Sequence, residues 1–277
     1  MTLARNAGVG IDGARAATRD GTELSYRLLK GAGKGRCVLI HSLAMDASFW
    51  DRVAAQLVAA ADVLVYDCRG HGRSGDLRGP YSVALHADDL ADLLDAVGWP
   101  RAVVAGSSMG GCIALAFAAA YPRRVAALCL IDTTAWYGPN AVQQWEERGQ
   151  KGRQEGMQSL VAFQKSRWVS DAFLAQHGDV VDAAIAVFLA NDTAAYLETC
   201  RMLGAVDQRA ALPGFAFPTR IVVGAEDYAT PVAMAEAMRD AIPGATLRVI
   251  DAVRHFTPLE CPAQIADELK ALADAAA

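Results

Sequence analysis

The sequence predicts an α/β fold in which a mostly parallel, eight-stranded sheet is covered by helices on both faces. Apolar runs rich in β-branched residues recur along the chain, segments with helical periodicity lie between them, and a glycine-rich turn joins one run directly to a helix. Continuous apolar strands that alternate with helices are typical of a parallel sheet buried on both faces. Seven such runs cover residues 24–29, 37–40, 63–66, 102–105, 127–131, 220–223 and 246–250.

The eighth strand is expected before the first of these runs. Asp20 and Gly21 are a turn signal just ahead of residues 24–29, so the first two strands are predicted to pair as a hairpin. Helical spacing of apolar residues predicts helices over residues 83–97, 109–121 and 231–241. The segment Gly98-Trp99-Pro100 supplies a stop signal for the first helix.

The alternation of strands and helices breaks between residues 133 and 213, where amphipathic helices follow one another. This stretch is interpreted as a helical cap inserted after the sixth strand of one core domain, which takes residues 1–132 and 214–277. Most aromatic side chains of the cap are expected to pack inside it, as aromatic residues commonly do. They are Trp136, Tyr137, Trp145, Phe163, Trp168, Phe173, Phe188 and Tyr196.

Composition excludes several classes of protein. An apolar fraction of 53% with 21% charged residues is that of an ordinary globular domain, and the net charge of −5 is spread without long runs of one sign. Neither a nucleic acid nor a membrane surface is therefore an expected partner. The first 20 residues lack the apolar core of a signal peptide, and no stretch reaches the roughly 18 apolar residues of a membrane span. The expected location is the cytoplasm.

The six cysteines stand far apart and form no Cys-x-x-Cys pair. Most lie inside apolar runs, where a thiol behaves as a small hydrophobic group. We expect reduced, mostly buried thiols and no zinc site. No cofactor is expected.

Residues 106–110 read Gly-Ser-Ser-Met-Gly, a Gly-x-Ser-x-Gly frame centred on Ser108. The frame lies between an apolar run and an alanine-rich helix, the strand–turn–helix context in which such a turn exposes a serine hydroxyl as a nucleophile. Ser107 would need small residues at 105 and 109, but position 109 is Met109. The frame therefore selects Ser108.

A serine nucleophile needs a base, and the base needs a third group that orients it. Among the five histidines, His255 follows the strand at residues 246–250, and ligands collect at the carboxyl ends of strands in parallel sheets. Asp227 follows another strand and gives the order Ser, Asp, His. Asp132 also stands at a strand end and remains an alternative acid.

Acyl transfer also needs backbone N–H donors for the developing oxyanion. Met109 follows the nucleophile at a helix N-terminus, so its N–H is one expected donor. The second is expected from the loop after residues 37–40, and our choice is the N–H of Leu43.

With these parts in this order, the chain resembles the α/β-hydrolase superfamily over nearly its whole length. The turn Arg69-Gly70-His71-Gly72 looks like a structural signature of that family. Several segments resemble the 3-oxoadipate enol-lactone hydrolases. They are His41-Ser42-Leu43, Asp132-Thr133-Thr134-Ala135, Arg167-Trp168-Val169 and residues 224–231.

Two departures from that group bear on the site. It tends to carry Asn at the position of Asp132, which keeps Asp132 open as the acid. The loop that carries His255, Arg254-His255-Phe256-Thr257-Pro258, also differs from the sequence expected for that group.

The resemblance implies a pocket for a small acid beneath the cap. Trp168 and neighbouring cap aromatics, Trp136 among them, would form its wall. Arg167 or another cap cation would meet the carboxylate of the substrate, although a helical arginine is more often solvated. His41 and Ser42 are also assigned to substrate binding.

The leading hypothesis is a cofactor-free serine hydrolase that cleaves a small carboxylic ester or lactone, with an enol-lactone of aromatic catabolism as one candidate. An amide or a carbon–carbon bond could be cleaved by the same three residues, because only the leaving group changes. A ligand receptor that retains the residues without turnover is the alternative from another class. Carboxylate-nucleophile chemistry is disfavoured because position 108 is serine, and a metalloenzyme is disfavoured because no metal-ligand cluster is present. The oligomeric state stays open, with a homodimer as one option.

Overall fold

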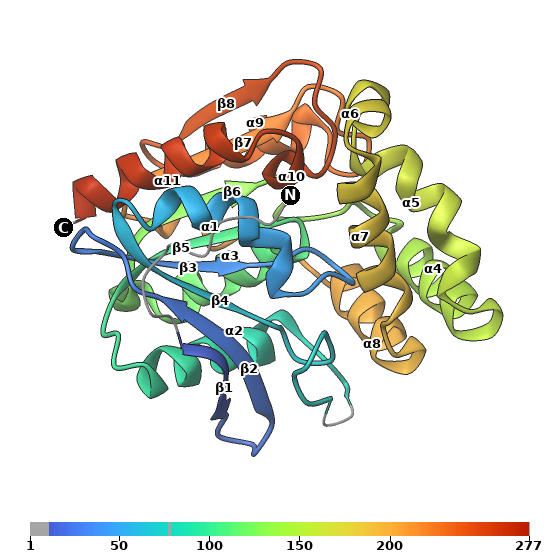
Figure 1. The fold of residues 1–277 in the computed structure, drawn as a ribbon, viewed down its shortest axis with the longest axis horizontal. Helices are drawn as coiled ribbons and strands as arrows, with labels where there is room; N and C mark the ends of the chain where they lie inside the picture. Colours follow the sequence, from blue (N-terminus) through green and yellow to red (C-terminus); the bar gives the residue numbers. More distant parts are fainter. Residues whose placement is uncertain (1–10, 77–78, 277) are drawn as a thin grey trace.

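The computed structural model describes residues 11–76 and 79–276, and these form an eight-stranded sheet with helices on both faces (Figure 1). The strand order is β1-β2-β4-β3-β5-β6-β7-β8. The strands are β1 (Ile11–Ala17), β2 (Glu23–Leu29), β3 (Gly35–Ile40), β4 (Ala61–Tyr66), β5 (Ala102–Ser107), β6 (Val125–Ile131), β7 (Thr219–Gly224) and β8 (Thr246–Ile250). The α/β fold class is confirmed. The first ten residues, which open the expected core domain, lie outside the described residues.

The sheet is mostly parallel, as predicted, with antiparallel pairs at one end. β2 is antiparallel to β1 and β4, and every other neighbouring pair is parallel. The hairpin between β1 and β2 turns at Asp20 and Gly21, as expected, and Gly21 adopts a φ of 88° that only glycine reaches without strain. β5 and β6 are buried along their whole length, so the centre of the sheet is the core of the molecule.

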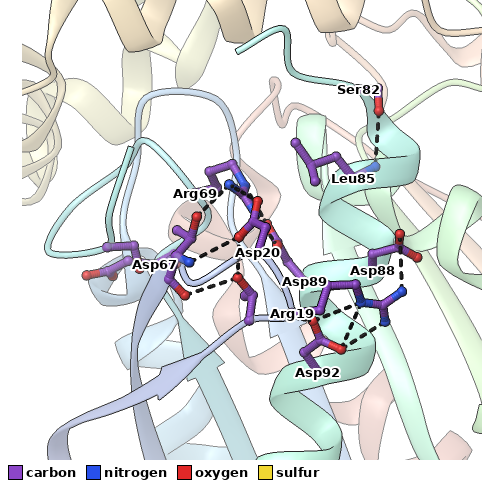
Figure 2. Close-up of polar contacts among 12 residues, drawn as sticks. Arg19, Asp20, Asp67, Arg69, Ser82, Leu85, Asp88, Asp89 and Asp92 are labelled. Atoms are coloured by element: carbon purple, nitrogen blue, oxygen red, sulfur yellow. Dashed lines mark hydrogen bonds and ion pairs between the residues drawn. The ribbon is translucent and has the colours of Figure 1, made fainter. Parts of the chain in front are cut away.

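Helices cover both faces of the sheet (Figure 1). α1 packs against α11 on one face, and α2 packs against α3 on the other. The helices outside the segment between β6 and β7 are α1 (Asp51–Leu57), α2 (Val83–Ala96), α3 (Met109–Ala120), α9 (Val232–Ala241), α10 (Thr257–Glu260) and α11 (Pro262–Ala276). The three helices expected from periodicity are all present, with ends within one residue of the predicted ones. Ser82 caps α2 by accepting a hydrogen bond from the Leu85 N–H at 3.1 Å (Figure 2).

Five helices lie between β6 and β7 in the chain and gather beside the sheet, at the right of Figure 1. We call residues 133–213 the helical insertion. α4 and α8 pack against each other within it. The five helices are α4 (Ala141–Glu155), α5 (Val161–Trp168), α6 (Asp171–Gln176), α7 (Gly178–Leu189) and α8 (Thr193–Gly204).

No single helix in the described part of the chain is long and apolar enough to cross a membrane, and α7 with α8 reaches that length only across a bend of 98°. All six cysteines are free thiols, and five are buried as expected; Cys261 is half-buried.

A buried arginine ties the turn after β4 to the first hairpin and to α2 (Figure 2). Arg69 is 1% exposed, and its guanidinium makes two hydrogen bonds to Asp89, at 2.9 and 2.6 Å. It also binds Asp20 at 2.9 Å and the hydroxyl of Thr22 at 2.6 Å. These bonds compensate the guanidinium for the water that it loses on burial.

Replacing Asp89 by alanine is expected to lower the free energy of unfolding by about 3 kcal/mol, because it leaves a buried cation with only part of its compensation. Urea denaturation measures the change. Asp95→Ala is the control on the same helix: Asp95 pairs with Arg124 at 2.8 Å but is 68% exposed, so its loss should cost less than about 1 kcal/mol. Equal costs at the two positions would contradict this account.

Three buried histidines make the fold sensitive to acid. Burial lowers the pKa of His41 to about 4, and it lowers the pKa values of His71 and His86 to about 3. The unfolded chain binds protons near the ordinary histidine pKa of about 6.5, whereas these folded histidines stay neutral. Stability is therefore fully present above about pH 6.5 and falls as the pH drops toward the folded pKa values.

His86→Phe is expected to weaken this pH dependence. A single histidine with so low a pKa loses about 2 kcal/mol of stabilisation between about pH 7.5 and about pH 5, and the variant removes that loss. A phenyl ring should fit, because His86 is buried edge-on to Tyr81 with ring centroids 5.8 Å apart. Denaturation curves at both pH values measure the effect, and an unchanged difference between them would refute it.

Candidate active site

Ser108 stands at the sharp turn between β5 and α3. Its backbone adopts φ 53° and ψ −115°, a conformation that a residue with a side chain rarely takes. A Cβ on Gly106 would lie 2.1 Å from the Gly110 carbonyl oxygen, and a Cβ on Gly110 would lie 2.1 Å from that of Ile40. Only glycine fits at either position, so the motif's two glycines are required by the close approach of the backbone.

The turn presents Ser108 and hides its neighbour. The Ser108 side chain lines a cavity, whereas Ser107 is completely buried and its hydroxyl has no partner within the described residues. Thr133 donates a hydrogen bond to the Ser108 carbonyl at 2.7 Å and holds the turn in place. The choice of Ser108 over Ser107 agrees with this geometry.

His255 lies between Ser108 and Asp227. Its Nε2 is 2.9 Å from the Ser108 Oγ, and its Nδ1 is 2.8 Å from Asp227 Oδ2. An ionised carboxylate only accepts hydrogen bonds, so the His255 proton lies on Nδ1 and Nε2 accepts from the Ser108 hydroxyl. The three side chains thus form one hydrogen-bonded series in the arrangement that general-base activation of a serine needs.

Asp227 is held as an anion by its surroundings. Burial by itself would raise the pKa of Asp227, but the interaction with His255 and hydrogen bonds from the backbone lower it. The N–H groups of Ala229 and Thr230 donate to Oδ1 at 2.8 and 2.9 Å, and the Thr230 hydroxyl donates to Oδ2 at 2.9 Å. These bonds fix the carboxylate that faces His255.

Asp132, the alternative acid, lies elsewhere in the network. Its Oδ2 accepts from the N–H and hydroxyl of Thr257, at 3.0 and 2.7 Å, and its Oδ1 accepts from the Gly224 N–H at 3.3 Å. Burial and the neighbouring Asp227 raise the pKa of Asp132 well above its ordinary value. Asp132 therefore joins the end of β7 to the loop that follows His255, and the structure brings Asp227 to the imidazole.

The two expected oxyanion donors lie beside Ser108. Met109 is the first residue of α3, and Leu43 lines the same cavity as Ser108. The close approach of Gly110 to the Ile40 carbonyl draws the start of α3 against the end of β3, from which the Leu43 loop departs. Neither N–H donates to a protein acceptor in the described part of the chain.

His41 does not reach the cavity, contrary to its assignment to substrate binding. It is completely buried, with Nδ1 donating to the Ser42 carbonyl at 2.8 Å and Nε2 accepting from the Cys68 N–H at 2.9 Å. It therefore ties the loop after β3 to the turn after β4. Ser42, its neighbour in the chain, does line the cavity.

The cavity has a volume of about 740 Å³ and lies between the sheet and the helical insertion. Ser108, His255 and Phe256 line it from the core. Trp168 and Arg167 line it from the insertion, as expected, and Trp168 stacks on Phe256 with ring centroids 4.9 Å apart. The Arg167 guanidinium lies 3.9 Å above the Phe163 ring.

Two exposed aromatic side chains also belong to the lining. Phe163 is 43% exposed and Tyr228 is 56% exposed, which makes them the large hydrophobic residues of this cavity most open to solvent. They mark where the cavity meets the surface.

Trp136 is not among the residues that line the cavity, contrary to its assignment to substrate binding. It forms a backbone bridge with Asp207, and the Arg209 guanidinium lies 3.8 Å above its ring. The next residue, Tyr137, lines the cavity instead. Successive side chains of an extended segment point to opposite sides, so an error of one position exchanges the cavity for the surface.

Sequence reasoning missed Arg148 on α4. Its guanidinium lies over the rings of Trp145 and Phe163, at 4.7 and 5.7 Å, and its Nε donates to the Tyr196 hydroxyl at 2.9 Å. Among the residues described, no carboxylate forms an ion pair with it, although it lines the cavity. The spacing of Trp145 and Arg148, three residues apart on one helix face, was the available signal.

Within residues 11–76 and 79–276, no group of three His, Cys, Asp or Glu side chains is arranged to hold a metal ion.

Residues 37–262 match the family model described as the alpha/beta hydrolase fold. The chain is 28% identical to 3-oxoadipate enol-lactonase 2 of Acinetobacter baylyi over 245 residues, which cover 88% of this chain and 91% of that protein.

Two solved structures are similar over almost the whole chain. The enol-lactonase from Burkholderia xenovorans LB400 has a TM-score of 0.88 and 30% identity, with 94% of this chain and 99% of that chain covered. A thermophilic esterase from Thermogutta terrifontis has a TM-score of 0.88 and 26% identity, with coverages of 97% and 99%.

Proposed function

This chain belongs to the α/β-hydrolase fold family, and from that premise we propose that it is a serine hydrolase that cleaves a small carboxylic ester or lactone. One observation carries the proposal: Ser108, His255 and Asp227 form a hydrogen-bonded series at 2.9 and 2.8 Å on the wall of a cavity. Lactonases and an esterase among the similar proteins support the same bond type. In this proposal Ser108 is the nucleophile, His255 the base and Asp227 the acid.

In the first step, the Ser108 Oγ attacks the carbonyl carbon while His255 Nε2 takes its proton. The imidazolium that forms is stabilised by Asp227, which accepts from Nδ1. The negative charge on the carbonyl oxygen is met by the Leu43 and Met109 N–H groups, each worth about 3 to 4 kcal/mol of barrier. His255 then gives its proton to the leaving oxygen, and the carbon–oxygen bond breaks to leave an acyl-Ser108.

In the second step, His255 takes a proton from water, and the hydroxide oxygen attacks the acyl carbon. The bond to Ser108 Oγ breaks, Oγ regains the proton from His255, and a carboxylic acid leaves. For a lactone, the leaving oxygen stays attached to the acyl chain, so the ring opens and one product results. No cofactor takes part in either step.

The charges of the cavity favour a substrate that carries a free carboxylate. Arg148, Lys151 and Arg167 line it, against one carboxylate from Glu147. Lys151 pairs with Glu155, whereas Arg148 and Arg167 lie over aromatic rings with no acidic partner in the described residues. Arg148 is the better placed of the two arginines, because two rings flank its guanidinium and the Tyr196 hydroxyl fixes it at 2.9 Å. An enol-lactone formed from a dicarboxylic acid keeps one carboxylate free, which fits this lining.

Arg148→Met is expected to raise KM for a carboxylate-bearing lactone by about 10- to 100-fold with little change in kcat. A charged hydrogen bond in a partly dry site contributes about 1.5 to 3 kcal/mol, and here it acts equally on substrate and transition state. Steady-state kinetics with the acid lactone and with its neutral methyl ester separate the two effects. Only the acid lactone should show the higher KM, and KM for the methyl ester should stay unchanged.

Arg153→Met is the matched control, since Arg153 is on the same helix and binds Thr193 at 3.1 Å rather than lining the cavity. It should leave KM unchanged. Equal losses for the acid and the neutral ester in Arg148→Met would show that Arg148 holds the pocket's shape and would contradict the carboxylate assignment.

The reaction itself is tested with a panel of short p-nitrophenyl esters, a carboxylate-bearing enol-lactone and an amide. We expect turnover of the lactone and the esters, and stoichiometric labelling of Ser108 by an organophosphate. If the amide is the preferred substrate, the proposal of an ester or lactone substrate is wrong and the protein is an amidase. A folded protein that neither labels nor turns over any member would overturn the enzyme assignment in favour of a ligand receptor.

A further inference from the structure

The backbone of His255 is held directly by the helical insertion. We call residues 166–171, which end α5 and begin α6, the α5–α6 segment. The His255 N–H donates to the Arg167 carbonyl at 3.3 Å, and the Phe256 N–H donates to the Trp168 carbonyl at 2.7 Å. The ring of Trp168 stacks on Phe256, and Phe256 in turn stacks on His255 at 5.7 Å. The insertion thus contacts the main chain of the base directly and reaches its ring through Phe256.

Arg254, the residue before the base, reaches from the same loop into the α5–α6 segment. Its Nη1 donates to the carbonyls of Ser166 and Val169 at 3.3 and 3.0 Å and to Asp171 at 3.0 Å. The side chain is only 12% exposed, whereas that of Asp171 is 87% exposed. The carbonyl contacts are therefore the better shielded part of the attachment.

The opposite side of Arg254 is also occupied. Its Nε lies 3.6 Å from Glu226, and its guanidinium lies 5.6 Å from the centre of the Tyr228 ring. Both residues belong to the loop that carries the acid Asp227. Arg254 consequently touches the insertion, the acid loop and its own loop at once.

Glu260 also joins the His loop to the α5–α6 segment. Its Oε1 accepts from the Arg254 N–H at 2.8 Å, and its Oε2 accepts from the N–H and hydroxyl of Ser170 at 3.0 and 2.5 Å. One carboxylate therefore joins the residue before the base to the start of α6. Charge-assisted hydrogen bonds of this kind are short and directional.

A base on a loop needs such support, because a misplacement of 1 Å at a reacting group can cost about 100-fold in rate. We propose that Arg254 and Glu260 are positioning residues that use the α5–α6 segment to hold His255 against Ser108. This inference rests on the proposed function, since it gives the two residues a role in the serine chemistry. The insertion then does more than enclose the substrate, because it also fixes the base.

Arg254→Met and Glu260→Gln test the proposal by separating kcat from KM. We expect each to lower kcat about tenfold with KM within about twofold, because a displaced base slows proton transfer without changing the pocket walls. The double variant should lose little more than either single one, because both act on one contact. Arg254→Lys, which keeps the charge and part of the reach, should recover part of kcat.

Arg209→Met is the control, since Arg209, like Arg254, lies over an aromatic ring and pairs with an aspartate, Asp207 at 2.6 Å, but its described contacts are to Trp136 and Asp207 and not to the His loop. It should leave kcat unchanged. Asp171→Asn should change kcat by less than about twofold, because exposed ion pairs contribute little. A rise in KM with unchanged kcat in Arg254→Met would overturn the proposal, as would equal losses in Arg209→Met.

Hydrogen exchange supplies a readout that does not depend on turnover. The His255 and Phe256 amides should exchange faster in Arg254→Met than in the wild-type protein, while amides in β5 and β6 stay protected. Unchanged exchange at both amides would overturn the proposal even if kcat fell. If the wild-type protein turns over no substrate and Ser108 does not label, the proposed function fails, and the exchange rates alone then decide whether the attachment holds the loop.

Discussion

Replacing Ser108 by alanine is expected to lower kcat by at least about 10⁴-fold while the protein stays folded. In the proposed mechanism the variant removes the atom that attacks the carbonyl, and what remains is the modest acceleration that oxyanion donors and substrate binding provide. Alanine keeps the backbone geometry of the turn, since its Cβ replaces a Cβ that is already there at φ 53°. Stopped assays with the best substrate of the panel, beside thermal denaturation, measure both properties.

Ser107→Ala is the matched control for this experiment. It removes a hydroxyl that is completely buried and has no partner within the described residues, one position from the proposed nucleophile. Its kcat should stay within about threefold of the wild-type value, since a buried hydroxyl away from the reacting atoms has no part in proton transfer. A residual rate above about one-hundredth in Ser108→Ala would show that another group attacks, and the assignment of Ser108 would be wrong.

Asp227→Asn is expected to lower kcat by about 10⁴-fold, the loss typical of an aspartate that fixes the tautomer of a catalytic histidine. An asparagine can turn its NH₂ toward Nδ1, because the neighbouring donors at Ala229 and Thr230 favour its oxygen on their side. The proton of His255 then lies on Nε2, and this nitrogen can no longer accept the proton of the Ser108 hydroxyl. The pocket is unchanged, so KM should change little.

Asp132→Asn gives the comparison that decides between the two acids. Asp132 accepts hydrogen bonds from Gly224 and Thr257 and makes no contact with His255 in the described structure. We expect it to lower the free energy of unfolding by about 1 to 3 kcal/mol, the range for a disturbed buried acceptor, and to lower kcat by less than about tenfold. A larger loss of kcat at Asp132 than at Asp227 would reverse the assignment.

The sheet and the main parts of the site were predictable because local patterns determine them. Continuous apolar runs specify buried parallel strands, and such strands place their carboxyl ends at one edge of the sheet. Ser108, Asp227 and His255 each follow a strand, so their meeting could be expected from chain order alone. That Asp227 and not Asp132 contacts His255 could not be predicted in this way. Both aspartates follow strands, and only the path of each loop decides which carboxylate reaches the imidazole.

The cavity was less predictable, because it depends on how helices of the insertion pack. Trp136 and Tyr137 differ by one position, and the sequence does not say which of two neighbours on an extended segment faces inward. His41 lies in a loop beside Ser108, but both of its ring nitrogens form hydrogen bonds with backbone groups. The sequence does not reveal such hydrogen bonds. Arg148 owes its place to the packing of α4 against α8, a contact between distant parts of the chain.

The attachment of the α5–α6 segment to the His loop also bears on how substrates arrive. A lid that swung away at this point would have to break the hydrogen bonds of His255 and Phe256 in every cycle and would disturb the base each time. Phe163 and Tyr228 are the exposed rings of the cavity lining, so we expect substrates to enter beside them through rotations of side chains. Such rotations take about picoseconds to nanoseconds, whereas domain movements take about microseconds to milliseconds. Turnover in this protein should therefore be insensitive to solvent viscosity up to rates at which diffusion itself becomes limiting.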